Sequence, residues 1–290
     1  MTLKPKIRLQ PNAEISRLKS RLQSLGLVTV CQEAQCPNLN ECWSGGTATI
    51  MIGGDTCTRG CRFCAVNTGN PSGWLNDEEP NQVAQIVAEG GWRYVVVTSV
   101  DRDDLPDGGA HHWAACLNAI DARCPETDIE ALIPDFQGSV EALATIAASA
   151  ADVVAHNLET VSRLTPTVRD RRASYHQSLS VLATLKQLGV RYTKSSLMLG
   201  LGETLDEIRF AMADLRRAEV DFLTLGQYLQ PSPKHLPVKE MLSQETFLAL
   251  QRQAEQEFGF AFCAAGSLVR SSYKAGEWFT QAVTKKTRHQ

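Results

Sequence analysis

Short apolar runs alternate with amphipathic helical patterns from about residue 47 onward, and this alternation limits the fold more than any other feature. Runs such as 48–52 and 94–98 are apolar nearly throughout, as in strands buried on both faces. The other strand candidates are 129–133, 152–155, 192–199 and 221–225. The helical patterns cover 80–89, 111–122, 140–148, 175–188, 205–218 and 244–258. The sequence therefore predicts an α/β fold, a partial or full parallel (β/α) barrel of about six strands.

Extensions flank this predicted barrel on both sides. Residues 1–46 are interpreted as an N-terminal extension with an amphipathic helix over 12–26, and residues 47–259 as the barrel. Residues 260–290 are interpreted as a C-terminal extension that begins with a short apolar run and contains Arg270-Ser-Ser-Tyr273. With no internal repeat or low-complexity linker, the 290 residues are expected to form one catalytic unit.

Charge and hydropathy argue against two classes of partner. The net charge of −3 provides no positive field for nucleic acid or for an anionic membrane. No apolar run reaches the ~18 residues that span a bilayer. The charged start is not followed by an apolar stretch, so we expect no signal peptide and a cytoplasmic location. In that reducing compartment the nine cysteines are expected to bind metal or do chemistry rather than form disulfides.

Three of these cysteines follow the first predicted strand. Cys57, Cys61 and Cys64 have C-x3-C-x2-C spacing, in a loop where barrel enzymes place their chemistry. Three thiolates can each take one iron of a cubane cluster and leave the fourth iron open for a substrate, whereas clusters that only transfer electrons are normally held by four cysteines. The alternative is a zinc site, which requires a fourth ligand that no nearby Cys or His supplies.

This triplet, with Phe63 before its last cysteine, resembles the signature of the radical SAM superfamily. The resemblance implies that the open iron of a 4Fe–4S cluster binds the amino and carboxylate groups of S-adenosylmethionine (SAM). It also implies that one electron from the reduced cluster cleaves the sulfonium and releases methionine and a 5′-deoxyadenosyl radical.

A second triplet precedes the barrel. Cys31, Cys36 and Cys42 have C-x4-C-x5-C spacing and resemble the auxiliary-cluster motif of the lipoyl synthase family. The resemblance extends over nearly the whole chain; matching stretches are 95–109, 156–161, 194–204, 225–232, 235–238 and 270–273. The chain departs from the family at Ser196, where Gly is usual, and at 170–172, where Asp-Arg-Arg stands near a usual Pro-Gly pair. These departures affect the expected fit of the substrate rather than the reaction.

The resemblance implies a radical SAM sulfurtransferase with two 4Fe–4S clusters. Lipoyl synthases insert sulfur at C6 and C8 of an octanoyl chain bound to a carrier protein. Both carbons are unactivated, so acid–base catalysis cannot act on them and a radical is required, with one SAM for each C–H bond. The resemblance also implies that the auxiliary cluster donates its sulfides, and that a serine of Arg270-Ser-Ser-Tyr273 ligates its fourth iron. By position we assign Ser272, with Ser271 as the alternative.

Six residues are candidates for binding SAM: the aromatic Phe63 of the signature and five polar residues. Thr98 and Ser99 end the second strand, where radical SAM enzymes bind the methionine part of the cofactor, and the family resemblance adds Asn157 and Glu159 after the fourth. Lys194, on the fifth strand, is costly to bury without an anion, and the SAM carboxylate is a candidate for that anion.

Two histidines and three further cysteines carry no such prediction. His111 and His112 are adjacent on a helix, so they point to different faces and no paired metal site is expected. The remaining cysteines have no triplet spacing and are expected in the core: Cys116, Cys124 and Cys263.

The implied partners follow from the reaction. They are octanoylated lipoyl carrier domains (E2 subunits of 2-oxoacid dehydrogenases and the glycine cleavage H protein), an electron donor such as flavodoxin or ferredoxin, and an iron–sulfur carrier protein. A different two-cluster sulfur transferase, similar to the methylthiotransferases, is the alternative enzyme, although the chain has no spare length for an RNA-binding module. A non-catalytic electron carrier or zinc-binding module is the alternative outside enzymes.

Overall fold

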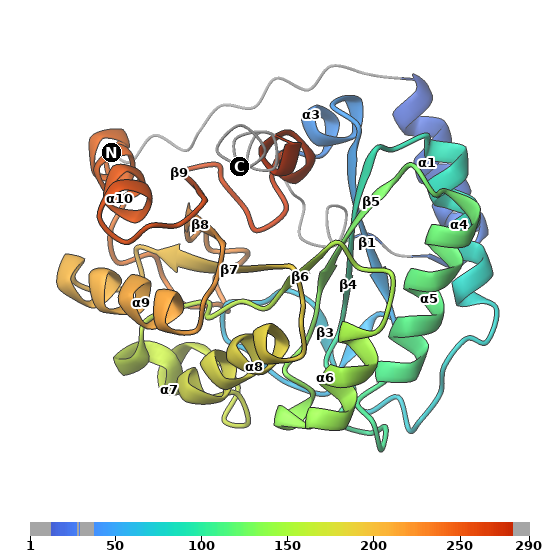
Figure 1. Cartoon of the computed structure of the whole chain (residues 1–290), viewed down its shortest axis with the longest axis horizontal. Coiled ribbons are helices and arrows are strands. Elements are labelled where there is room, and N and C mark those ends of the chain that lie inside the picture. The colour runs from blue at the N-terminus through green and yellow to red at the C-terminus, as the bar shows by residue number, and fades with distance from the viewer. Residues whose placement is uncertain (1–12, 28, 30–37, 281–290) are drawn as a thin grey trace.

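A sheet of seven parallel strands is the centre of the molecule (Figure 1). The computed structural model describes residues 13–27, 29 and 38–280. The strands, in spatial order, are β1 (Thr47–Ile52), β4 (Tyr94–Ser99), β5 (Asp128–Leu132), β6 (Val153–Ala155), β7 (Tyr192–Leu199), β8 (Phe222–Gln227) and β9 (Phe262–Gly266). Strands β2 (Thr56–Cys57) and β3 (Asn67–Thr68) form a separate small parallel pair.

Helices cover the outer face of this sheet, so each strand is buried on both sides. They are α4 (Glu79–Gly90), α5 (Ala110–Arg123), α6 (Val140–Ala147), α7 (Thr165–Val168), α8 (Tyr175–Gln187), α9 (Leu205–Arg217) and α10 (Gln244–Gln256), with the short η1 (Phe136–Gly138) and η2 (Ser162–Leu164). The capping box of Thr204 and Glu207 starts α9. Within the described part of the chain, no helix is long and apolar enough to cross a bilayer.

The apolar run at 260–263 continues into a seventh strand, where about six were predicted. β9 pairs with β8 from Phe222↔Phe262 to Gly226↔Gly266. The sequence pattern was too weak to predict this strand because 264–266 reads Ala-Ala-Gly, which lacks the β-branched and aromatic residues favoured in strands. The division of the chain into 1–46, 47–259 and 260–290 stays a prediction; the sheet itself continues to Gly266.

The barrel is partial, because β1 and β9 are unpaired edges. The N-terminal α1 (Ala13–Ser24) packs on α4, while α3 (Leu39–Ser44) and the helical residues 275–280 lie between the two edges (Figure 1). The amide of Asn38 donates to the carbonyl of Leu268 at 2.6 Å. At Gly276 a Cβ would come within 2.6 Å of the Tyr94 Cβ, so only glycine lets this segment approach β4 so closely.

Aromatic side chains close the end of the barrel at which the strands begin. Phe279 packs against Tyr94, Tyr192 and Phe222, with ring centroids 5.6, 5.7 and 6.5 Å away. Loops with polar residues lie at the opposite end, where the strands finish. The C-terminal segment therefore plugs one end of the barrel and reaches the other through its residues near 270.

Candidate active site

The cysteine triplet lies where the barrel strands end, as expected for a parallel barrel. Cys57, Cys61 and Cys64 all line one cavity of about 270 Å³, and all three thiols are free. The loop that carries them runs between β2 and β3, and the carbonyl of Asp101 after β4 accepts a hydrogen bond from the backbone of Thr58 at 3.0 Å. The structure thus brings the three sulfurs of the predicted cluster site together.

Each of these sulfurs receives a backbone N–H. The amides of Arg59 and Asp170 donate to Sγ of Cys57 and Cys61 at 3.4 and 3.3 Å, and Val66 provides a similar bond to Cys64. Burial raises the pKa of Cys57 to about 11 and that of Cys61 to about 12. A metal centre must therefore displace the thiol protons, after which the N–H groups stabilise the negative sulfurs. The residues present fit an iron–sulfur cluster.

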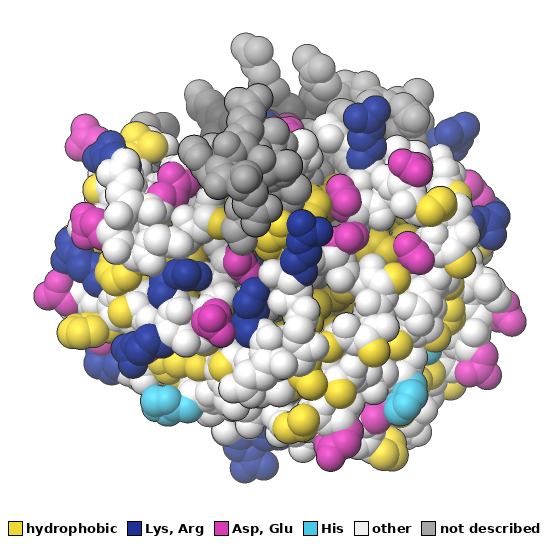
Figure 2. Space-filling model, viewed as in Figure 1, with side chains coloured by type: hydrophobic (Ala, Val, Ile, Leu, Met, Phe, Trp, Pro, Cys, Tyr) yellow, Lys and Arg dark blue, Asp and Glu magenta, His cyan; other side chains and the backbone are white. Residues whose placement is uncertain are grey.

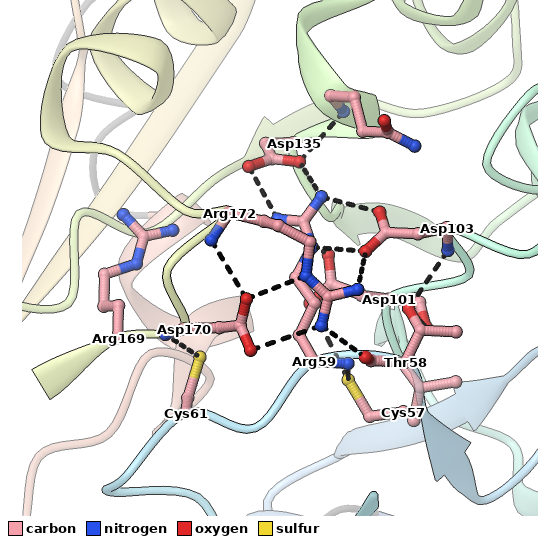
Figure 3. A network of polar contacts seen from close by, with 12 residues as sticks. Cys57, Thr58, Arg59, Cys61, Asp101, Asp103, Asp135, Arg169, Asp170 and Arg172 are labelled. Carbon is pink, nitrogen blue, oxygen red and sulfur yellow. Dashed lines mark hydrogen bonds and ion pairs between the residues drawn. The ribbon is translucent and has the colours of Figure 1, made fainter. Parts of the chain in front are cut away.

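A buried arginine holds the loop in place. Arg59 is 4% exposed and forms paired hydrogen bonds of 2.7–2.8 Å to Asp103 and Asp135, with Asp101 3.4 Å away (Figure 3). Burial opposes ionisation of Asp135, yet the Arg59 hydrogen bonds lower the pKa of that carboxyl to about 2. Two bidentate contacts make the guanidinium a rigid anchor for the loop.

The segment 170–172 forms hydrogen bonds to the same loop (Figure 3). The Asp170 carboxylate accepts the backbone N–H of Gly60 at 2.9 Å and is bonded to Arg172. Arg172 in turn donates to the carbonyl of Thr58 at 2.6 Å and lies 3.2 Å from Asp103. The residues at which the chain departs from the family pattern, 170–172, therefore form a polar clasp, a set of hydrogen bonds and ion pairs that holds the cysteine loop.

Five of the six residues predicted to contact SAM line this cavity: Phe63, Thr98, Ser99, Asn157 and Glu159. The hydroxyls of Thr98 and Ser99 already donate to backbone carbonyls, at 3.0 and 2.9 Å. Asn157 donates to the Glu159 carboxylate at 3.0 Å, and burial raises the pKa of Glu159. Glu159 also has φ of 67°, a backbone conformation that non-glycine residues retain mainly at functional sites.

Lys194 is the exception and corrects the sequence prediction. Its ammonium lies 2.8 Å from both carboxylate oxygens of Glu130, which also accepts the hydroxyl of Tyr94 at 2.8 Å. These residues line a small separate pocket inside the barrel rather than the cysteine cavity. The anion that allows Lys194 to be buried is thus Glu130 of the protein itself. The sequence could not indicate this pair, because β5 and β7 are not neighbours in the sheet.

Arg169 is the cation that the sequence did not reveal. It is 8% exposed and lines the cysteine cavity, yet it forms no ion pair with any described carboxylate. One of its nitrogens donates to Ser178 Oγ at 2.8 Å, and Ser178 bonds to His156 at 2.8 Å. No local pattern marks Arg169, because its burial depends on contacts with the carbonyl of Leu158 and with Ser178 on α8 rather than on spacing.

Glu79 and His112 hold the backbone at the end of β1, just before the cysteine loop. The Glu79 carboxylate accepts the backbone N–H of Gly53 at 2.8 Å and contacts His112 at 2.5 Å, with Cys116 buried nearby. His111 instead bonds to Asp107 on another side of α5, which confirms that the two histidines point apart.

The auxiliary-cluster motif is described in part. Cys31 and Cys36 lie outside the described residues, whereas Cys42 is buried on α3. The Tyr273 hydroxyl donates to the Glu41 carboxylate at 3.3 Å, and Glu41 directly precedes Cys42 on α3, so this helix brings Cys42 close to the Arg270–Tyr273 segment. Lys274 also pairs with Glu41 at 2.8 Å. Of the two candidate serines, Ser271 lines the cysteine cavity; ligation by Ser272 stays a prediction.

Comparison with solved structures supports the fold. The FeFe-hydrogenase maturase HydG of Carboxydothermus hydrogenoformans matches with a TM-score of 0.59 at 12% identity, over 85% of this chain and 63% of that one. Methylornithine synthase matches with a TM-score of 0.57 at 14% identity, over 83% of this chain and 72% of the other. At such low identity these likenesses show the shared partial-barrel fold alone.

Comparison of sequences is more specific. The radical SAM superfamily profile matches residues 51–215. Lipoyl synthase of Thermus thermophilus is 56% identical over 92% of this chain and 83% of its own length. That of Pyrobaculum arsenaticum is 52% identical over 93% and 92%, and the mitochondrial enzyme of Branchiostoma floridae is 53% identical over 93% and 73%. The chain therefore belongs to the lipoyl synthase family of the radical SAM superfamily.

Proposed function

We propose that this enzyme uses SAM and 4Fe–4S clusters to insert two sulfur atoms, at C6 and C8, into an octanoyl chain carried by a lipoyl carrier domain. The observation that carries the proposal is the meeting of two distant segments at one cavity. Ser271, from the segment whose Tyr273 bonds to Glu41 next to Cys42, lines the same cavity as the triplet Cys57, Cys61 and Cys64. We therefore expect a substrate in this cavity to reach both the SAM site and the auxiliary site.

When bound at the three cysteines, the cluster supplies the single electron that cleaves the sulfonium of SAM. The chain's own residues bind and orient the cosubstrate. Arg169 is a buried cation on the cavity wall that forms no ion pair with a carboxylate of the described residues, so we assign it to the SAM carboxylate in place of Lys194. Asn157 and Glu159 provide an amide and a carboxylate for its amino and hydroxyl groups.

The apolar part of the cavity wall suits a hydrocarbon chain. Side chains without polar atoms line it alongside the cysteines: Met51, Phe63, Val66, Leu132, Ile133 and Ala173. Such a wall excludes water, which would otherwise compete with the acyl chain for the site. No acid–base residue is required for the hydrogen abstraction, since the carbons have no acidic proton.

The auxiliary site is assigned to Cys31, Cys36, Cys42 and Ser272, with its cluster as the sulfur donor. A serine oxygen is a hard ligand on a site that favours soft thiolates, so the Ser272 bond is expected to yield first. The proposed partners are the octanoylated E2 and H-protein domains, a flavodoxin or ferredoxin as electron donor, and an iron–sulfur carrier protein that rebuilds the site. The cytoplasmic location stays a prediction.

The test is an oxygen-free assay with SAM, dithionite and an octanoylated lipoyl-domain peptide, read by product mass. We expect a product with two added sulfurs and two SAM cleaved for each lipoyl group. The matched control is the Cys42→Ala variant, which should still cleave SAM but add no sulfur. A wild-type protein that cleaves SAM and leaves the peptide unmodified would contradict the proposal.

A further inference from the structure

Three exposed cationic residues lie in the cysteine loop or next to residues that bond to it: Arg62, Arg171 and Lys234. They come from three separate segments, and none of them lines the cysteine cavity. Arg62 stands between the second and third cysteines of the triplet, and Arg171 stands in the segment 170–172, but the sequence assigned a role to none of the three cations.

Hydrogen bonds bring these three segments together. Arg62 lies within the loop, and its amide donates to the carbonyl of Val168 at 3.0 Å. Arg171 directly follows Asp170, whose amide bonds to Cys61 Sγ at 3.3 Å. Lys234 directly precedes His235, a ring nitrogen of which lies 3.0 Å from the carbonyl oxygen of Cys64. Arg62 thus belongs to the loop itself, and Arg171 and Lys234 each adjoin a residue that bonds directly to the loop.

Acidic and basic side chains are interspersed on the face seen in Figure 2, in keeping with the net charge of −3. Near the cysteine loop, Arg59 and Arg172 are paired with acidic residues, whereas no ion pair among the described residues includes Arg62, Arg171 or Lys234. Across 57–66, 166–174 and 231–236, Asp170 is the one acidic residue. Its carboxylate is already bonded to Arg172 and to the amide of Gly60. Arg171 and Lys234 thus have no acidic neighbour within these segments to offset their charge.

We propose that Arg62, Arg171 and Lys234 form the docking surface for an acidic one-electron carrier protein, an inference that rests on the proposed function. Each SAM cleavage consumes one electron. The carrier would give up one electron to the cluster that Cys57, Cys61 and Cys64 would hold, and that electron would cleave the sulfur–carbon bond of SAM into methionine and a carbon radical. A carrier on this surface sits directly over the loop that holds the three sulfurs.

Charge complementarity of this kind speeds encounter and is weakened by salt. An octanoylated carrier domain with an acidic surface is the other protein that charge alone would attract here. That domain, however, must deliver its acyl chain into the cavity, and none of the three cations lines the cavity. Their position fits electron delivery better than acyl delivery.

The experiment compares the holoenzyme with the double variant Arg171→Glu/Lys234→Glu. Arg62 stays unchanged because its guanidinium also donates to the carbonyl of Thr167 at 3.1 Å. The matched control is Arg252→Glu, which reverses one exposed charge on α10. SAM cleavage is measured with reduced flavodoxin at several salt concentrations, and separately with dithionite, which needs no docking surface.

We expect the KM for flavodoxin to rise about tenfold in the double variant, with a weaker salt dependence, since rim charges act mainly on association. The dithionite-driven rate, the KM for the octanoylated domain and the control variant should match the wild type. An equal loss with dithionite would overturn the proposal, because the residues would then support the loop itself. An increase confined to the KM for the octanoylated domain, or no change at all, would overturn it too. A wild-type enzyme that inserts no sulfur would instead contradict the proposed function.

Discussion

The backbone amide of Asp170 donates a hydrogen bond to Sγ of Cys61 at 3.3 Å, although the two residues are 109 positions apart. The Asp170 side chain also accepts the amide of Gly60 from the same loop. One residue on the α7–α8 connection thus stabilises both the backbone and a sulfur of the cysteine loop. The environment of the cluster depends on the loop's neighbours as well as on the cysteines themselves.

Replacing Asp170 should loosen the cluster loop. Asp170→Ala leaves the Gly60 amide without its acceptor and Arg172 with Asp103 as its remaining carboxylate partner, at a cost of about 1–2 kcal/mol to the local structure. We expect iron to be lost to a chelator several-fold faster than from the wild type, measured by visible absorption under argon. Asp170→Asn retains an acceptor and should be intermediate; an unchanged rate in both variants would contradict a clasp.

The Lys194–Glu130 pair should matter for stability and not for SAM. Lys194→Met leaves a buried carboxylate with only Tyr94 as a partner, which is expected to cost about 3–5 kcal/mol. Adding Glu130→Gln should recover much of that loss in a urea titration. The KM for SAM should match the wild type in the double variant. A large increase in that KM would show that Lys194 contributes to SAM binding after all.

His156 should make the fold less stable in mild acid. Burial lowers the pKa of His156 from 6.5 to about 4, so the folded protein keeps this ring neutral over a range in which the unfolded chain is protonated. Stability is therefore complete above pH 6.5 and falls as the pH drops toward 4, by up to about 3 kcal/mol.

The measurement for His156 is the free energy of unfolding at several pH values. His156→Gln should be less stable at neutral pH, because it loses the bonds to Ile133 and Ser178, but should show a flatter dependence in this window. Equal slopes in the two proteins would show that other groups dominate the acid response.

Arg169 should govern the affinity for SAM. Arg169→Met removes the unpaired cation on the cavity wall, and the loss of a charge-assisted contact is expected to raise the Kd of SAM by about ten- to a hundredfold. Titration of the reduced holoenzyme with SAM, followed by electron paramagnetic resonance, measures this directly. Ser178→Ala serves as the control, since it removes a partner of Arg169 but keeps its charge.

The two serines near the C-terminus should differ in their effects. Ser272→Cys replaces a hard ligand with a soft one, so the auxiliary cluster should assemble while sulfur transfer becomes slow. Ser271→Ala should leave iron content near that of the wild type and act instead on the cavity, which Ser271 lines. Full sulfur transfer by Ser272→Cys, measured by product mass, would count against Ser272 as the labile ligand.

Local sequence patterns were enough to predict most of the helices and strands. The strand runs, the helix periods and the capping box at Thr204 are short-range signals, and the six strands and seven helices predicted from them are confirmed. The triplet of Cys57, Cys61 and Cys64 was also readable, because a cluster requires its ligands close together in space and a short loop provides that. Motifs of this kind carry their chemistry in their spacing.

Contacts between distant segments were not readable, because burial and pairing arise only when the chain is folded. The partner of Lys194, the burial of Arg169 and the clasp of Asp170 on Cys61 each join residues from different strands or loops. β9 escaped prediction for a related reason, since its small residues become a strand only when β8 offers an edge to pair with. Spacing along the chain carries no information about such neighbours, whereas desolvation and charge pairing in the folded molecule depend on them entirely.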